Sequence, residues 1–231
     1  MARNVWSDRP LGVKLAALVA VGAVSLGAFA VVSVQALNAT GEKTGHVLDG
    51  AEATGDALMA DMMHDAVRGD VLAALLSVGV GSAYESAATD LEEHSATFRA
   101  IFAEMHEDDL SPDVIAAVEQ VTPAVEDYLA SAAQIVELAG IDAAQARAAY
   151  PQFGEAFSAL EEELPVLEET VTAFAENAAA EAAEQRSTAI RLSLIVAAAG
   201  VLILALLGWV ITRSVVRPLR RVVDVVTGLA D

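Results

Sequence analysis

The sequence predicts an all-α protein in which two transmembrane helices flank an extracytoplasmic up-down-up-down four-helix bundle. Two apolar stretches, residues 15–34 and 192–212, are each about 20 residues long, which is enough for a helix to cross a ~30 Å hydrocarbon layer. The segment between them is acidic and its apolar residues recur with helical spacing. A short basic segment follows the second stretch and completes the predicted order of elements.

The charges around the two apolar stretches predict the orientation. Basic residues lie just outside both stretches: Arg3, Arg9 and Lys14 before the first, and Arg213, Arg217, Arg220 and Arg221 after the second. By the positive-inside rule we expect residues 1–14 and 213–231 to be cytoplasmic. Residues 35–190 then face outward from the cell membrane, between transmembrane helices at 15–34 and 191–212.

The outward segment is strongly acidic. Residues 36–187 contain 30 Asp and Glu against 5 Lys and Arg. This balance argues against nucleic acid as a partner, because phosphate binding needs a basic face. The chain has no cysteine, so neither disulfides nor cysteine metal sites are possible.

The first apolar stretch has two interpretations. Its length and the anchoring Lys14 favour an uncleaved signal-anchor helix. The alternative is a cleavable secretory signal, for which Val34-Gln35-Ala36 resembles a cleavage site.

The exterior segment divides into four predicted helices at residues 36–78, 83–107, 112–139 and 151–190. Glycines at 79 and 81 and the stretch 140–150 provide two of the turns. Ser111, Pro112 and Asp113 form a typical helix start, with a capping serine, proline at the first position and an acid in the first turn. We expect Pro165 to kink the last helix.

The last helix carries the clearest apolar pattern. Its apolar residues are spaced alternately by four and three, as in a bundle or coiled coil. They are Phe153, Phe157, Leu160, Leu164, Leu167, Val171, Phe174 and Ala178. We expect aromatic residues of the middle helices, Tyr84, Phe98, Phe102 and Tyr128, to join the same core.

The first helix is less regular. We expect its apolar stripe to comprise Leu58, Met62, Ala66, Leu72 and Leu76. Four glycines weaken it, at positions 41, 45, 50 and 55, each at a cost of about 1 kcal/mol relative to alanine. They indicate either a close helix–helix contact or a loosened segment.

The basic segment after the second apolar stretch supplies a family resemblance. Arg217, Pro218 and Leu219 lead a helix whose apolar residues recur at helical spacing, and this segment resembles the first helix of a HAMP signal-transfer domain. The whole layout resembles the sensory half of a methyl-accepting chemotaxis receptor, and residues 61–72 are similar to first-helix sequences of such receptors. Residues 213–231 would then begin a HAMP domain, and we expect an output module in a longer parent protein.

The resemblance implies a homodimeric chemoreceptor sensor module in the cell membrane. Such a module detects an extracytoplasmic small molecule, or a periplasmic-type binding protein, and transmits the signal through the second transmembrane helix and HAMP. A cytoplasmic kinase and adaptor would be reached through the output domain. The alternatives are the input half of a sensor histidine kinase or diguanylate cyclase with the same membrane layout, and a scaffolding membrane coiled coil without a ligand.

One polar cluster is a candidate ligand site. Asp61, His64, Asp65 and Arg68 are spaced to lie on one flank of the first helix. Arg68 is able to offer two parallel hydrogen bonds to a carboxylate, and His64 titrates near neutral pH. The alternative is a solvated face on which Asp65 pairs locally with Arg68.

Catalysis and metal binding are not indicated. No nucleophile with a supporting base and no glycine-rich phosphate loop is visible, so we expect no enzymatic activity and no cofactor. A single acid–histidine pair, Asp61 and His64, is too few ligands for a bundle metal site, so we expect no metal.

Overall fold

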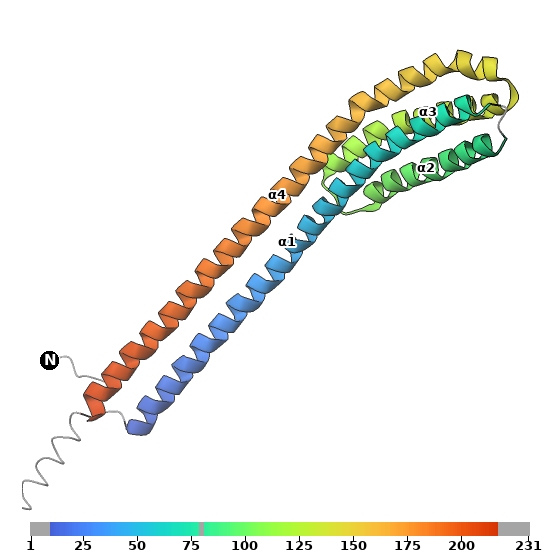
Figure 1. The fold of residues 1–231 in the computed structure, drawn as a ribbon. Coiled ribbons are helices and arrows are strands. Elements are labelled where there is room, and N and C mark those ends of the chain that lie inside the picture. The colour runs from blue at the N-terminus through green and yellow to red at the C-terminus, as the bar shows by residue number, and fades with distance from the viewer. Residues whose placement is uncertain (1–9, 79–80, 217–231) are drawn as a thin grey trace, which may run out of the picture. The chain divides into compact units, whose positions relative to one another are not determined.

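The computed structural model describes residues 10–78 and 81–216. They form four α-helices, α1 (Leu11–Leu76), α2 (Gly81–Glu107), α3 (Pro112–Ile141) and α4 (Ala143–Ile211), and a π-helical turn η1 (Thr212–Val216) ends α4 (Figure 1). No strand occurs among these residues. The all-helical prediction is confirmed.

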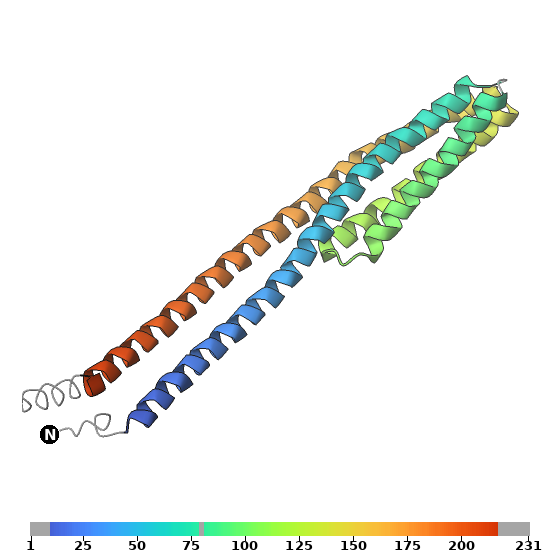
Figure 2. The ribbon, with the colours of Figure 1, turned by 60° about the horizontal axis from the view of Figure 1, so that its bottom comes forward.

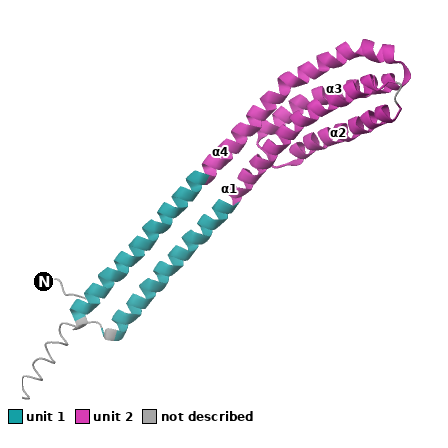
Figure 3. Cartoon of the chain, viewed as in Figure 1, with its two compact units in different colours: residues 1–41, 183–231 teal, residues 42–182 magenta. Residues whose placement is uncertain are grey.

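The chain divides into two compact units, each of which takes one part of α1 and one part of α4 (Figure 3). Unit 1 comprises residues 1–41 and 183–231. Unit 2 comprises residues 42–182, including all of α2 and α3. Unit 2 lies inside the predicted exterior segment, residues 35–190.

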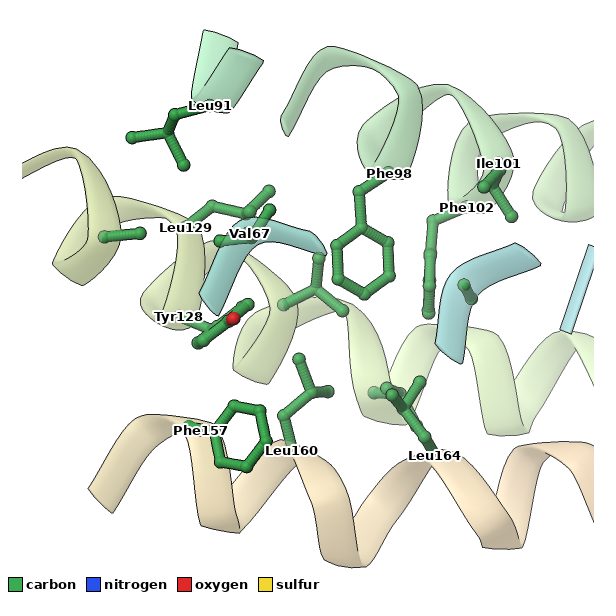
Figure 4. Close-up of a cluster of buried hydrophobic side chains, with 14 of the residues drawn as sticks. Val67, Leu91, Phe98, Ile101, Phe102, Tyr128, Leu129, Phe157, Leu160 and Leu164 are labelled. Atoms are coloured by element: carbon green, nitrogen blue, oxygen red, sulfur yellow. The ribbon is translucent and has the colours of Figure 1, made fainter. Parts of the chain in front are cut away.

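All four helices contribute to one core in unit 2. Figure 2 shows α2 and α3 running beside the parts of α1 and α4 in this unit. The largest fully buried side chains are Tyr128, Phe98 and Phe153, and Figure 4 shows Tyr128 and Phe157 next to each other in this cluster. Phe98, Phe102 and Tyr128 are buried as expected, and Tyr84 is partly buried against the core.

The start of α3 follows the predicted capping pattern. Ser111 has extended backbone angles and its side chain accepts a hydrogen bond from the Val114 amide at 3.4 Å. Pro112 is the first helical residue, where its missing N–H costs nothing. The negative charge of Asp113 in the first turn is stabilised by the helix dipole.

The junction between α3 and α4 differs from the prediction of a turn at residues 140–150. Asp142 alone connects the helices: its amide donates to the Leu138 carbonyl, and its carboxylate accepts from the amides of Ala144 and Gln145. These hydrogen bonds lower the pKa of Asp142, the Gln145 amide contributing most. One residue therefore ends α3 and begins α4, and α4 starts eight residues earlier than expected.

Gly140 lies inside α3 and has a packing role. The Tyr84 hydroxyl donates to the Val136 carbonyl at 2.8 Å and passes over Gly140. A Cβ at position 140 would lie 2.5 Å from that hydroxyl oxygen. Glycine is needed here for the close approach of α2 rather than to end the helix.

The apolar pattern of α4 is confirmed. Seven of its eight predicted positions are buried, and Phe174 is partly buried against the same core. The helix continues through Pro151 and Pro165, so neither proline ends it.

The core face of α1 was predicted wrongly. Leu58, Met62 and Leu76 are exposed, by 52%, 60% and 86%. The buried residues are mostly smaller: Ala53, Ala57, Ala60, His64, Val67, Val71 and Ala74. Small side chains fit this face because the aromatic residues of α3 and α4 fill the space opposite it.

The glycines of α1 fall into two groups. Gly50 is buried, and a Cβ there would lie 2.9 Å from the Cα and 3.1 Å from the Cβ of Ala175 in α4. Gly41, Gly45 and Gly55 have nothing within 4 Å of such a Cβ. A close helix–helix contact within the chain thus explains Gly50 alone.

Both helices of unit 1 are long and apolar enough to cross a membrane. The most apolar window of each, 18 residues long, is 0% buried. Many large apolar side chains are exposed: Val19, Val24, Leu26, Phe29, Val31 and Val34 on α1, and Leu194, Ile195, Val201, Leu202, Ile203 and Leu206 on α4. Within the unit the helices approach each other closely at Gly200, where a Cβ would lie 3.5 Å from the Ser25 Cβ.

Replacing Gly50 by alanine should destabilise the protein by about 1–3 kcal/mol, because the added methyl group overlaps the Ala175 backbone. Replacing Gly154 by alanine should stabilise the protein by about 0.5–1 kcal/mol through helix propensity, because this glycine lies within α4 with open space around it. Urea unfolding of the whole chain in detergent, followed by circular dichroism, measures both. Equal effects of the two substitutions would contradict the close contact.

Candidate ligand site on helix α1

The structure divides the four predicted ligand residues between the surface and the core. Asp61, Asp65 and Arg68 are exposed on α1. His64 is only 2% exposed and belongs to the core of unit 2. The expected flank of four polar side chains is therefore a surface group of three.

His64 joins three helices. Its ring stacks on Phe157 of α4, with centroids 4.1 Å apart and planes at 12°, and its Nε2 lies 3.2 Å from the Phe157 carbonyl oxygen. Its own carbonyl accepts a 2.7 Å hydrogen bond from the hydroxyl of Tyr128 in α3. A neutral imidazole that carries its proton on Nε2 satisfies this contact.

Burial sets the charge state of His64. Loss of water around the ring lowers the pKa of His64, opposed in part by the Phe157 carbonyl and by the charges of Asp65, Asp61 and Glu161. Burial likewise raises the pKa of the Tyr128 hydroxyl, which stays protonated and donates. His64 is thus a neutral core residue at pH 7.

Arg68 is held by an aromatic ring. Its guanidinium carbon lies 4.3 Å from the centroid of Phe157, the ring on which His64 also stacks. Among the described residues, no ion pair joins Arg68 to Asp65. The contact with Phe157 holds the guanidinium group over the ring and leaves its hydrogen-bond donors available at an exposed position.

Two polar pairs between helices were not visible in the sequence. His94 of α2 lies 2.7 Å from the carboxylate of Asp70 on α1, which is 9% exposed. Burial raises the pKa of Asp70, and the hydrogen bond and charge of His94 counteract this. Arg99 of α2 makes a two-pronged pair with Glu126 of α3 at 2.9–3.0 Å. Residues 24 or more positions apart give no local pattern from which to predict such pairs.

An acidic group lies where α1 passes the end of α2. Burial raises the pKa of Asp56, and the neighbouring charge of Glu104 adds to the shift, followed by Glu52 and Asp108. One carboxylate oxygen of Asp56 is buried without a hydrogen-bond partner. In the described part of the chain, no group of three or more His, Asp or Glu side chains is arranged to hold a metal ion.

A groove of about 780 Å³ opens between α1, the start of α3 and α4. Its lining combines apolar residues with the ion pair of Lys43 and Glu181, which are 2.5 Å apart. The hydrogen bond from Lys43 and its charge lower the pKa of Glu181. Three separate segments of the chain form this groove, so no single motif could predict it.

The predicted coupling residues Arg217, Pro218 and Leu219 lie outside the described residues. Immediately before them, α4 ends in the π-helical turn η1, and the Arg213 guanidinium lies 5.6 Å from the Trp209 ring. Single π-helical turns are rare and often accompany functional sites.

No protein-family model matches the chain, and neither curated proteins nor solved structures show a significant match to it.

Replacing His64 by phenylalanine should make the protein less sensitive to acid. Because the pKa of His64 is lowered in the folded state, the unfolded chain binds more protons, and stability is lost as pH falls below about 6.5. The loss due to this residue is at most about 1.4 kcal/mol per pH unit. Unfolding of wild type and His64→Phe between pH 7.5 and 5.5 measures it. His106→Asn, at an exposed histidine, is the control. If the free energy of unfolding of His64→Phe changes with pH as steeply as that of the wild type, the buried neutral state is contradicted.

Proposed function

We propose that this chain is the sensory half of a dimeric transmembrane receptor of the methyl-accepting chemotaxis type. Unit 2 acts as an extracytoplasmic up-down-up-down four-helix bundle that binds a small molecule or a binding protein. The apolar parts of α1 and α4 span the cell membrane, with both ends of the chain cytoplasmic. The segment after α4 begins a HAMP domain that leads to a kinase-controlling output module.

The observation that carries the proposal is the length of two helices. α1 has 66 residues and α4 has 69, and each passes from an exposed apolar segment into the packed core of unit 2. Because a helix is stiff along its axis, a shift of α4 caused in unit 2 is transmitted along the same helix. Shifts of about 1–2 Å are typical of such switches.

The surface of α1 supports a homodimer. Exposed residues on this helix follow a regular spacing of three and four, which is the pattern of a coiled-coil seam. They are Leu48, Ala51, Gly55, Leu58, Met62, Asp65, Gly69, Leu72 and Leu76, and we call this set the α1 seam. The core of unit 2 does not use it, so a second copy of α1 is its natural partner.

The glycines and charges of the seam fit this arrangement. A Cβ on Gly55 or Gly69 would meet nothing within 4 Å in the chain, so these glycines leave room for a partner helix. Asp65 lies in the seam, with Asp61 and Arg68 beside it. The ligand-binding group we propose is these three residues, with Arg68 held above Phe157 by the core.

The end of α4 supports the coupling role. The π-helical turn η1 changes the helical repeat just before Arg217, Pro218 and Leu219, which we propose transfer the signal. A sensor histidine kinase or diguanylate cyclase would use the same input half. The coding sequence that follows Asp231 in the parent gene separates these output classes.

Single cysteines in the α1 seam should crosslink two copies of the chain. The natural sequence has no cysteine, so Met62→Cys and Leu72→Cys each introduce one thiol. Mild oxidation in membranes should give a disulfide-linked dimer on a non-reducing gel. Glu162→Cys, at an exposed position on α4, is the matched control and should remain monomeric. A dimer through Glu162→Cys alone would place the interface elsewhere.

A disulfide between α1 and α4 in unit 1 should lock the signalling output. The Cβ–Cβ distance of 3.5 Å between Ser25 and an alanine-like Gly200 is within the range for a disulfide. The chain carrying Ser25→Cys and Gly200→Cys is fused to the cytoplasmic half of a chemoreceptor with a measurable kinase output. Oxidation should hold kinase activity in one state, and reduction should release it.

The single variant Ser25→Cys is the control, and oxidation should leave its kinase output unchanged. If the disulfide forms in the double variant and the output still does not change, α4 does not transmit a signal past α1, and the proposal fails.

A further inference from the structure

We infer that the groove of about 780 Å³ in unit 2 is a binding site for a small organic cation, an ammonium ion with alkyl substituents. This site is separate from the Asp61, Asp65 and Arg68 group on α1. The role of the groove in signalling rests on the proposed receptor function, whereas cation binding to the groove is tested independently.

The charge of the lining favours a cation. One lysine, Lys43, stands against four carboxylates, and Glu181 already pairs with it. The other three carboxylates belong to Asp109, Asp113 and Glu169, and none of them takes part in an ion pair among the described residues. A ligand with a positive charge therefore gains attraction that an anion would not.

The apolar part of the lining favours alkyl groups around that charge. Leu110 is 8% exposed and Phe174 is partly buried against the core, and both line the groove beside Pro112 and Ala173. A phenyl ring attracts a cation through its π-electrons, and the attraction grows when water is displaced. Alkylated ammonium ions combine a charge with an apolar surface and lose little hydration on binding, unlike a metal ion or a free ammonium ion.

The groove joins the elements that the proposed function requires. α1 contributes Lys43 and His46, the connection from α2 and the start of α3 contribute residues 109–113, and α4 contributes residues from Glu169 to Glu181. A ligand here contacts α4 and α1 at once, close to the Lys43–Glu181 pair that links them. Its binding would bias the position of α4, the helix that continues into unit 1.

Choline is a suitable probe, and its neutral isostere 3,3-dimethyl-1-butanol is the matched control ligand. The whole chain is placed in nanodiscs of phosphatidylethanolamine and phosphatidylglycerol, which contain no choline. Calorimetric titration at fixed ionic strength should detect choline binding and no binding of the isostere. Equal binding of the isostere, or an equal response to calcium chloride, would overturn the assignment.

Two substitutions locate the site. Phe174→Leu and Glu169→Gln should each weaken choline binding by roughly tenfold, through loss of the aromatic face or of one charge. Glu162→Gln removes the same charge from an exposed position of α4 outside the groove and should leave binding unchanged. If all three variants bind choline like the wild type, or if Glu162→Gln weakens binding as much as Glu169→Gln, the groove is not the site.

The ammonium group could belong to a free solute or to a lipid headgroup. A second titration uses nanodiscs of phosphatidylcholine. Competition from these discs against free choline assigns the groove to the headgroup, whereas unchanged binding assigns it to a soluble cation. Failure of choline to bind in any disc overturns this inference and leaves the proposed receptor function to the dimer and disulfide experiments.

Discussion

The packing around Tyr128 is the constraint on which the rest of unit 2 depends. This residue is 0% exposed, its ring lies 5.2 Å from that of Phe153, and its hydroxyl donates to the carbonyl of His64 across the core. Tyr128 is large and is hydrogen-bonded to α1, so it leaves little space opposite it. The side chains of α1 that face it must therefore be small. The alanine-rich inner face of α1 and the exposure of Leu58 and Met62 both fit this requirement.

The same constraint explains how much of the fold could be predicted from the sequence. The start of α3 and the core face of α4 were predicted well, because a capping serine marks the first and large apolar residues mark the second. In α1 the larger residues suggested the wrong face, since burial there selects for small size and not for hydrophobicity. His64 was expected on the surface because it is polar, whereas it is buried and stacks on Phe157 in the core. The groove near Lys43 brings together distant segments, which no local pattern indicates.

The two proposed binding sites are formed by different sets of helices. The Asp61, Asp65 and Arg68 group includes one residue of the α1 seam, Asp65, so a ligand there would affect how two copies of the chain pack together. The groove is lined by α1, α3 and α4 of a single copy. Phe157 belongs to the core and also contacts Arg68, so changes in packing around this ring alter how the arginine is held.

The one-residue junction at Asp142 has a geometric consequence for the whole of α4. Each residue of an α-helix turns the chain by about 100°. Because Asp142 caps both neighbours with its own amide and carboxylate, it leaves no slack that could absorb an inserted or deleted residue. The junction therefore sets the angular phase of a helix that runs without interruption to Ile211. We therefore expect the insertion or deletion of one residue here to rotate every side chain of α4 relative to α3.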